Sequence, residues 1–347
     1  FFFHADAGIR DAQESRGLGD VYKRQQYKSG IFLPELNLHL DSRIPSEIGF
    51  ISHAHADHFG RHKKIFCSTQ TAQLLITRFK CDPKRIASLD FYEPFEIGPF
   101  LLKLLPAGHI FGSAMLHVIS KTNGASLLYT GDFKLRESYT AETNALIPAD
   151  TLIMETTFGK PNWIFPGLTE IEEQIKCFAL EAFSVGHVPI FLCYSLGKSQ
   201  ELQAILGKAG IPYASHRIVY EMTMACRRAG CKVASGLKFD GLVPDNHALI
   251  LPPNSAKKIL PLIPHCKTVM LSGWGLDARA IYRFGTDVSI PLSDHADFNE
   301  LKEAVNQVRP KKVITVHGFT REFASELRRL KYEAWSLQGY DQLELDL

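Results

Sequence analysis

Six consecutive residues, His53-Ala-His-Ala-Asp-His58, place three imidazoles and a carboxylate side by side. The apolar run over residues 48–52 predicts a strand that ends where this cluster begins. Side chains alternate along an extended chain, so His53 and His55 point the same way and can bind one cation. If the chain then turns, the last two polar side chains can reach a second cation. We therefore interpret the cluster as a cage for two divalent cations rather than as a solvated histidine-rich turn.

Further polar constellations follow strand-like runs later in the chain. They centre on His109 between two glycines, Asp132 in Thr-Gly-Asp-Phe, Glu155 in Glu-Thr-Thr-Phe, His295 in Ser-Asp-His-Ala-Asp-Phe and His317 in Val-His-Gly. Each alone is a weak signal, because a single histidine after a strand is more often structural. Together they are what we expect of a sheet that presents a site at one edge.

The order of these motifs, HxHxDH, GHxxGSA, TGDF, ETTFG, SDHADF and VHG, resembles that of the metallo-β-lactamase superfamily and specifically its β-CASP nuclease branch. The sequence is similar to prokaryotic proteins described as mRNA 3′-end-processing-factor-like or as ligase-associated DNA exonucleases. The resemblance runs from about Gly30 to the C-terminus and includes the segment Cys193–Leu202. It implies an α/β fold, a four-layer αββα sandwich with an inserted small α/β cap lobe.

The resemblance also implies two neighbouring cation sites that share one carboxylate. The ligands of the first site would be His53, His55, His109 and Asp132. The ligands of the second site would be Asp57, His58, His317 and Asp132. Nitrogen and carboxylate ligands without thiolates fit zinc, with manganese or iron as alternatives.

Catalytic roles follow from the same resemblance. The two ions would activate a water molecule for in-line attack on phosphorus, with Asp57 serving both as ligand and in catalysis. His295 would protonate the leaving 3′ oxygen, and Glu155 would orient it and favour its protonated form. Asp41, at the end of its strand, would hold the metal loop from behind, although a turn-capping aspartate is the alternative.

The segment Ser195-Leu-Gly-Lys-Ser199 resembles the tail of a nucleotide-binding loop. That motif needs a glycine where Leu192 stands, so we do not expect an ATP site. A helix that begins at Gly197 with Lys198 beside it can still bind a backbone phosphate. We therefore predict phosphate contacts for Ser195, Gly197 and Lys198, and leave open a plain helix start with a solvated lysine.

The chain divides into four parts by pattern. Residues 1–25 lack an initial methionine and an apolar period; they look like a translated sequencing adapter, which we expect to be disordered. Residues 26–158 and 268–347 are predicted to form the two parts of the metallo-β-lactamase domain. Residues 159–267 alternate helix and strand and are predicted to form the cap. A capping box at residues 169–172 should begin its first helix, and Asp297 should cap a later one.

The composition indicates the class of protein and the compartment in which it works. With 45% hydrophobic and 22% charged residues it is ordinary for a soluble globular chain, and it has no apolar run long enough to span a bilayer. Seven scattered cysteines indicate reduced thiols and a cytoplasmic location. A net charge of +2 does not indicate nucleic-acid binding by itself, so any basic track must be local. Arg279 and Arg283 are candidates for that track and equally for solvated surface.

These features predict a metal-dependent nuclease that hydrolyses phosphodiester bonds of single-stranded DNA or RNA, as an exonuclease in DNA repair or in RNA 3′-end processing. A DNA ligase and a helicase would be its partners in repair, and no membrane is involved. Two alternatives stay open: a hydrolase of a small ester or thioester, and a non-catalytic scaffold. The sequence does not distinguish RNA from DNA, the polarity of cleavage, the metal or the oligomeric state.

Overall fold

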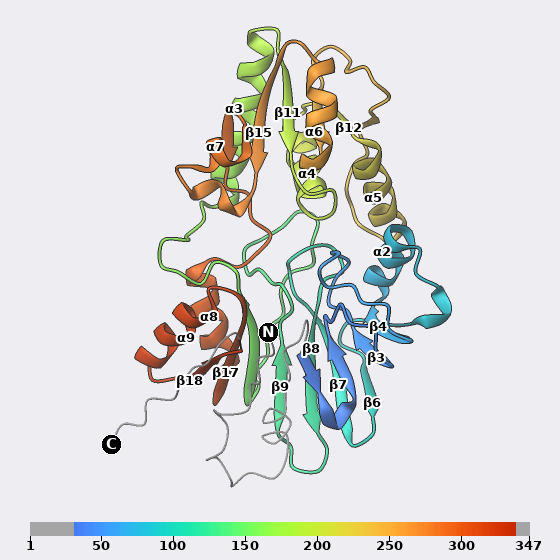
Figure 1. The fold of residues 1–347 in the computed structure, drawn as a ribbon, viewed down its shortest axis with the longest axis vertical. Coiled ribbons are helices and arrows are strands. Elements are labelled where there is room, and N and C mark those ends of the chain that lie inside the picture. The colour runs from blue at the N-terminus through green and yellow to red at the C-terminus, as the bar shows by residue number, and fades with distance from the viewer. Residues whose placement is uncertain (1–30, 338–347) are drawn as a thin grey trace, which may run out of the picture.

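A computed structural model describes residues 31–337, which form two lobes stacked along the long axis of the molecule (Figure 1). We call the lobe built from β1–β10, β17 and β18 the base lobe, and the lobe built from β11–β16 the cap. Within residues 31–337, no helix has the length and apolar character that crossing a membrane requires. The proposed sequencing-adapter segment lies outside the described residues.

Two sheets face each other in the base lobe. The first has the order β1-β2-β3-β4-β5, with bounds Ile31–Leu33, Leu38–Leu40, Ile48–Phe50, Lys64–Ser68 and Ile86–Leu89. The second has the order β18-β17-β10-β9-β8-β7-β6. Its strands in chain order are β6 Pro94–Ile97, β7 Phe100–Pro106, β8 Ala114–Ser120, β9 Ser126–Tyr129, β10 Thr151–Thr156, β17 Lys312–Gly318 and β18 Glu333–Ser336.

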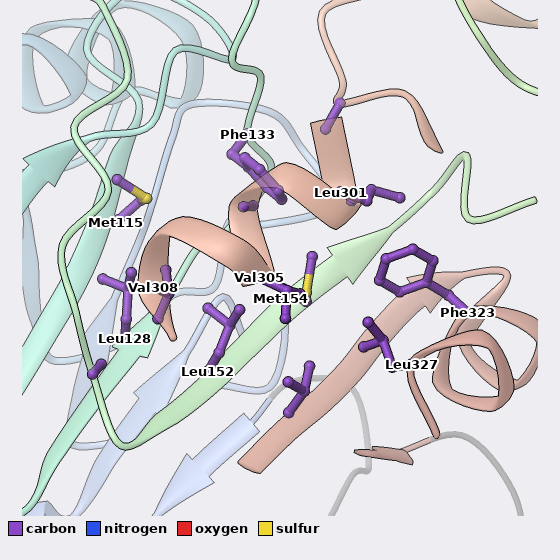
Figure 2. Close-up of a cluster of buried hydrophobic side chains, with 14 of the residues drawn as sticks. Met115, Leu128, Phe133, Leu152, Met154, Leu301, Val305, Val308, Phe323 and Leu327 are labelled. Carbon is purple, nitrogen blue, oxygen red and sulfur yellow. The ribbon is translucent and has the colours of Figure 1, made fainter. Parts of the chain in front are cut away.

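Helices cover the outer faces of this pair of sheets. The helix α2 (Thr69–Phe79) packs on the first sheet, while α8 (Phe298–Val308) and α9 (Thr320–Arg329) pack on the second. Figure 2 shows Leu152 and Met154 of β10 beside apolar side chains of α8 and α9. The expected four-layer αββα sandwich is therefore confirmed.

The core between the two sheets follows from strand alternation. Along β7, Leu102 and Leu104 are buried between the sheets, whereas Leu101 and Lys103 on the other face are only half-buried. Phe50 of β3 and Leu116 of β8 pack in the same cluster. Because one face of each strand is buried between the sheets, a shift of one residue would expose that face, so the register of the strands that carry the site is fixed.

The cap is a parallel sheet with helices on both faces. Its order is β13-β12-β14-β11-β15-β16, and every recorded strand pair in it is parallel. The strands are β11 Val188–Leu192, β12 Tyr213–Ser215, β13 Leu237–Lys238, β14 Ala248–Leu251, β15 Cys266–Leu271 and β16 Val288–Ile290. The helices are α3 Leu168–Ser184, α4 Lys198–Lys208, α5 Arg217–Arg228, α6 Pro253–Ile259 and α7 Ala280–Phe284. Single 3-10 turns occupy Pro34–Leu36, Pro83–Arg85, Leu260–Leu262 and Gly273–Leu276.

Two sequence-based boundaries are wrong. We predicted a return to the base lobe at residue 268, but β15 pairs with β11 and β16 pairs with β15, so the cap extends through Ile290. The apolar pattern identifies a strand without saying which sheet it joins. The predicted capping box at residues 169–172 is also wrong, because α3 begins at Leu168 with Gly167 as its N-cap. The predicted cap at Asp297 is confirmed, with Glu300 completing a capping box.

The two-sheet core predicts unequal effects of two leucine substitutions on one strand. Leu104→Ala leaves a cavity between the sheets and should lower the free energy of unfolding by about 3–5 kcal/mol. Leu101→Ala, on the half-buried face, should lower it by less than about 1.5 kcal/mol. Urea denaturation of both variants measures the difference. Equal losses would contradict the assignment of the core.

Candidate metal centre

The predicted site residues come from the ends of strands in both lobes. The histidine-rich loop follows β3, His109 lies in the loop between β7 and β8, and Asp132 follows β9. Glu155 and His317 are the second-last residues of the neighbouring parallel strands β10 and β17. Carboxyl ends of parallel strands meet at one edge of a sheet, which explains why side chains far apart in the sequence gather here.

Four of the predicted ligands converge on one point. One ligand atom each of His53, His55, His109 and Asp132 lies within 4.8 Å of the others. The Nδ1 atom of His55 is 3.0 Å from Nε2 of His53 and 3.2 Å from Nε2 of His109. Burial lowers the pKa of all three imidazoles, that of His55 to about 4, so they are neutral and offer lone pairs.

Hydrogen bonds fix which nitrogen of each imidazole faces this point. Ser52 Oγ donates to Asp41 Oδ2 over 2.6 Å, so His53 Nδ1 must donate to Ser52 Oγ over 2.9 Å. His55 Nε2 donates to the carbonyl of Leu196, and His109 Nδ1 donates to the carbonyl of Asp294. The three remaining nitrogens therefore carry lone pairs directed at one another, an arrangement that fits a cation between them.

The side chains of the second predicted ligand set lie farther apart than those of the first set. His58 Nε2 lies 3.2 Å from Asp132 Oδ2 and 3.8 Å from Asp57 Oδ2, and the Asp57 side chain is 75% exposed. The rings of His58 and His317 are 5.8 Å apart. Burial lowers the pKa of His58, but the Asp132 and Asp41 carboxylates outweigh burial and raise it well above its ordinary value. A cation at this set must therefore displace a proton from His58.

Asp41 lies behind the loop, where the sequence placed it. Its carboxylate accepts hydrogen bonds from the backbone N–H of Ser52 over 2.7 Å and from the hydroxyl of Tyr129 over 2.7 Å, and it lies 3.0 Å from His58 Nδ1. Sequence reasoning missed Ser52 and Tyr129. Their only signal was position, one residue before the loop and at the end of β9.

Glu155 and His295 form a contact pair next to the first ligand set. His295 Nδ1 lies 2.9 Å from Glu155 Oε1, and Glu155 is fully buried. Burial lowers the pKa of His295, but Glu155 and Asp132 outweigh it and raise the pKa to about 9. The ring of His295 is 4.7 Å from that of His109. In the metal-free protein a protonated imidazole therefore lies beside the predicted cation site, and general acid catalysis requires such a group.

Lys198 is buried in an ion pair, whereas one of the two sequence-based interpretations had it solvated. Its side chain is 7% exposed and makes an ion pair with Asp294, which is equally buried. Burial raises the pKa of Asp294, but Lys198 and nearby histidines hold it well below its usual range. The alternative of a solvated lysine is therefore wrong, and Lys198 ties the cap to the centre. The contacts predicted between phosphate and Ser195, Gly197 and Lys198 stay predictions.

The loop before α4 is packed tightly against the base lobe. Gly197 has φ +91°, and a Cβ atom there would lie 2.4 Å from Cγ2 of Ile110. One turn into α4, Glu201 accepts hydrogen bonds from Ser138 Oγ over 2.6 Å and Thr140 Oγ1 over 2.9 Å. The cap thus contributes backbone carbonyls and buried charges to the centre, rather than only covering it.

Comparison with known proteins matches the chain to one family model and to several relatives. Residues 288–335 match the family model described as "Zn-dependent metallo-hydrolase RNA specificity domain". The chain is 40% identical over 325 residues to a "Probable DNA ligase" of Opitutus terrae, covering 93% of this chain and 32% of the relative. It is 26% identical to the mouse "DNA cross-link repair 1A protein" over 96% of this chain and 35% of that protein. It is 31% identical to an "RNase J-like protein" of Methanocaldococcus jannaschii over 45% of this chain and 42% of that protein.

The chain spans about a third of the length of the first two relatives. The matched model names a zinc-dependent hydrolase, and the four converging donors are of the type that binds divalent metal. Both observations support divalent-metal binding by this chain.

The Glu155–His295 contact predicts the titration of His295 in metal-free protein. The folded-state pKa of about 9 lies above the ordinary 6.5, so protonation stabilises the fold fully below pH 6.5 and the effect is lost as pH rises through about 9. Glu155→Gln removes the partner charge and should lower the pKa of His295. Histidine NMR titration in EDTA measures both proteins, and an unchanged pKa in the variant would contradict the attribution to Glu155.

The buried ion pair predicts strong coupling between Lys198 and Asp294. Lys198→Met leaves a buried carboxylate without its partner and should lower the free energy of unfolding by about 3–5 kcal/mol. The double variant with Asp294→Asn should regain most of that loss, because no uncompensated charge remains. A urea-denaturation cycle over the four proteins gives the coupling energy. Additive losses would show that the pair does not hold the cap.

Proposed function

Because the chain belongs to the metallo-β-lactamase superfamily, in its β-CASP nuclease branch, we propose that it hydrolyses phosphodiester bonds of single-stranded nucleic acid. The observation that carries the proposal is the contact of Glu155 with His295 beside the four converging donors. The 3′ oxygen of a nucleotide is a poor leaving group unless it is protonated. A thioester releases a thiolate that needs no such acid, so the pair favours the phosphodiester over a thioester; a small oxygen ester stays the alternative.

In this proposal, different side chains of the centre bind the cations and donate the proton. Two divalent cations, zinc or manganese, would supply Lewis acidity at the two ligand sets and lower the pKa of water there to about 7. Asp132 Oδ2 lies 3.7 Å from His53 Nε2 and 3.2 Å from His58 Nε2, so its carboxylate faces both ligand sets. His295 donates its proton to the leaving oxygen while Glu155 holds the ring in place.

The burial of the centre supports a single strand as substrate. His53, His109 and Asp132 are at most 6% exposed, whereas Asp57 is exposed and His295 is half-buried. A single strand is thinner than a duplex, so we infer that it reaches the buried donors more readily.

The names of the relatives support a role in nucleic-acid processing and do not decide between DNA and RNA. Two of them are named for DNA ligation and DNA cross-link repair, and one is named RNase J-like. The match to a third of a protein named DNA ligase suggests that strand trimming and strand joining act together. We therefore include a DNA ligase as a proposed partner in repair.

The proposal predicts metal-dependent cleavage of end-labelled oligonucleotides. The wild type should cleave single-stranded DNA or RNA with zinc or manganese and lose activity in EDTA. His55→Ala should lower the rate more than about 100-fold, because even partners outside the ligand set typically matter 10–100-fold. His39→Ala, a half-buried histidine outside the centre, is the matched control. No cleavage by the wild type with either metal, or full activity of His55→Ala, would contradict the proposal; turnover of a thioester alone would favour the small-ester alternative.

A further inference from the structure

Three aromatic side chains stand around the centre without a role in the chemistry above. We call them the aromatic rim: Tyr194, Trp274 and Phe319. Tyr194 is 59% exposed, and the other two are half-buried. Tyr194 and Trp274 follow the carboxyl ends of β11 and β15, which are hydrogen-bonded neighbours, and Phe319 follows β17 in the base lobe. The rim therefore belongs to both lobes.

Ring contacts connect Trp274 and Phe319 to the proposed acid through Phe158. The ring of Phe158 lies 6.1 Å from that of His295 and 4.9 Å from that of Trp274. Trp274 and Phe319 lie 6.3 Å apart in an edge-to-face arrangement. One buried ring, that of Phe158, therefore separates Trp274 from His295, and Phe319 lies next to Trp274.

Tyr194 lies next to the other side of the centre. It is two residues before Leu196, whose carbonyl accepts the hydrogen bond of His55. Tyr194 is more than half exposed even though Leu196, two residues on, packs against side chains of the base lobe. Packing between the lobes accounts for Trp274, which contacts Phe158 and Trp163, but it does not account for Tyr194.

Each ring of the rim has a cation over it. Lys198 Nζ lies 5.3 Å from the Tyr194 ring centre, Arg283 Cζ lies 5.8 Å from that of Trp274, and Lys160 Nζ lies 4.2 Å from that of Phe319. Lys198 and Lys160 also pair with carboxylates, whereas Arg283 is exposed. Aromatic rings interleaved with cations match the stacked bases and charged backbone of a single strand. Of these three cations, Arg283 is the one that is exposed to a backbone phosphate, so this track of rings and cations is mainly aromatic.

We propose that the aromatic rim is a base-stacking subsite. Bases on one side of the scissile phosphate stack on Tyr194, and bases on the other side stack on Trp274 and Phe319. The inference rests on the proposed function and adds the chemistry by which the strand is recognised. Stacking needs unpaired bases, so the rim also selects single strands over duplexes.

Binding in EDTA tests the rim apart from catalysis. Fluorescein-labelled ten-nucleotide strands of deoxythymidine or uridine are titrated with the full chain, and anisotropy gives the dissociation constant. Tyr194→Leu and Trp274→Leu should each weaken binding about tenfold, since each removes one stacking ring. Tyr194→Phe and Trp274→Phe keep the ring and should stay within about twofold of the wild type. A strand with abasic sites should bind the wild type and Tyr194→Leu equally.

Tyr139→Leu is the matched control. Tyr139 is 39% exposed; its backbone N–H donates to Glu201 over 3.0 Å, but its ring points along α4 to Lys208, whose Nζ lies 4.9 Å from the ring centre. Lys208 is about 15 Å along the helix axis from Lys198. It should bind like the wild type. Because Tyr194 is largely exposed, its leucine variant should keep the far-UV spectrum of the wild type.

The outcomes separate the rim from the nuclease proposal. If the wild type cleaves with metal but Tyr194→Leu and Trp274→Leu, natively folded, bind as tightly as the wild type, the rim is overturned and the nuclease stands. If the rim variants lose binding but the wild type cleaves no strand with zinc or manganese, the rim stands and the nuclease proposal falls. A wild type that neither binds nor cleaves overturns both.

Discussion

The buried carboxylate of Asp132 is the constraint on which the rest of the structure depends. It is 6% exposed, and burying a charge costs several kcal/mol unless partners compensate for it. The compensation comes from the protonated imidazoles of His58, whose Nε2 lies 3.2 Å away, and His295, neither of them adjacent to Asp132 in the sequence. The sandwich of two sheets serves to bring these side chains to one edge and hold them there.

The cap is a structural part of the centre. The carbonyls of Leu196 and Asp294, in the loops after β11 and β16, accept the N–H groups of His55 and His109 and so set which nitrogen faces inward. The buried pair of Lys198 and Asp294 joins the same loops. A displacement of the cap would therefore disturb two histidines of the ligand set as well as the path of a substrate.

Much of this arrangement was predictable from sequence, for a physical reason. The histidine-rich loop and the polar residues at strand ends together indicated a site, and the family resemblance then supplied the two ligand sets and the pairing of Glu155 with His295. The αββα layers followed from the family resemblance. These predictions depended on chemistry that only certain side chains can perform.

The parts that failed depend on information that is not local. The run at Cys266–Leu271 reads as a buried strand in either lobe, and only its pairing with β11 places it in the cap. Backbone carbonyls such as that of Leu196 have no residue-type signal, because every residue carries one. Lys198 looked solvated because its partner Asp294 is 96 residues away, although an aspartate next to His295 was a usable hint.

Bound-metal stoichiometry tests most directly whether one buried carboxylate serves two cation sites. Purified protein is dialysed against zinc, and the bound metal is counted per chain for the wild type, His317→Ala and Asp132→Asn. The shared carboxylate predicts about two ions for the wild type, about one for His317→Ala and fewer than one for Asp132→Asn. Two ions retained by Asp132→Asn, or none bound by the wild type, would contradict it.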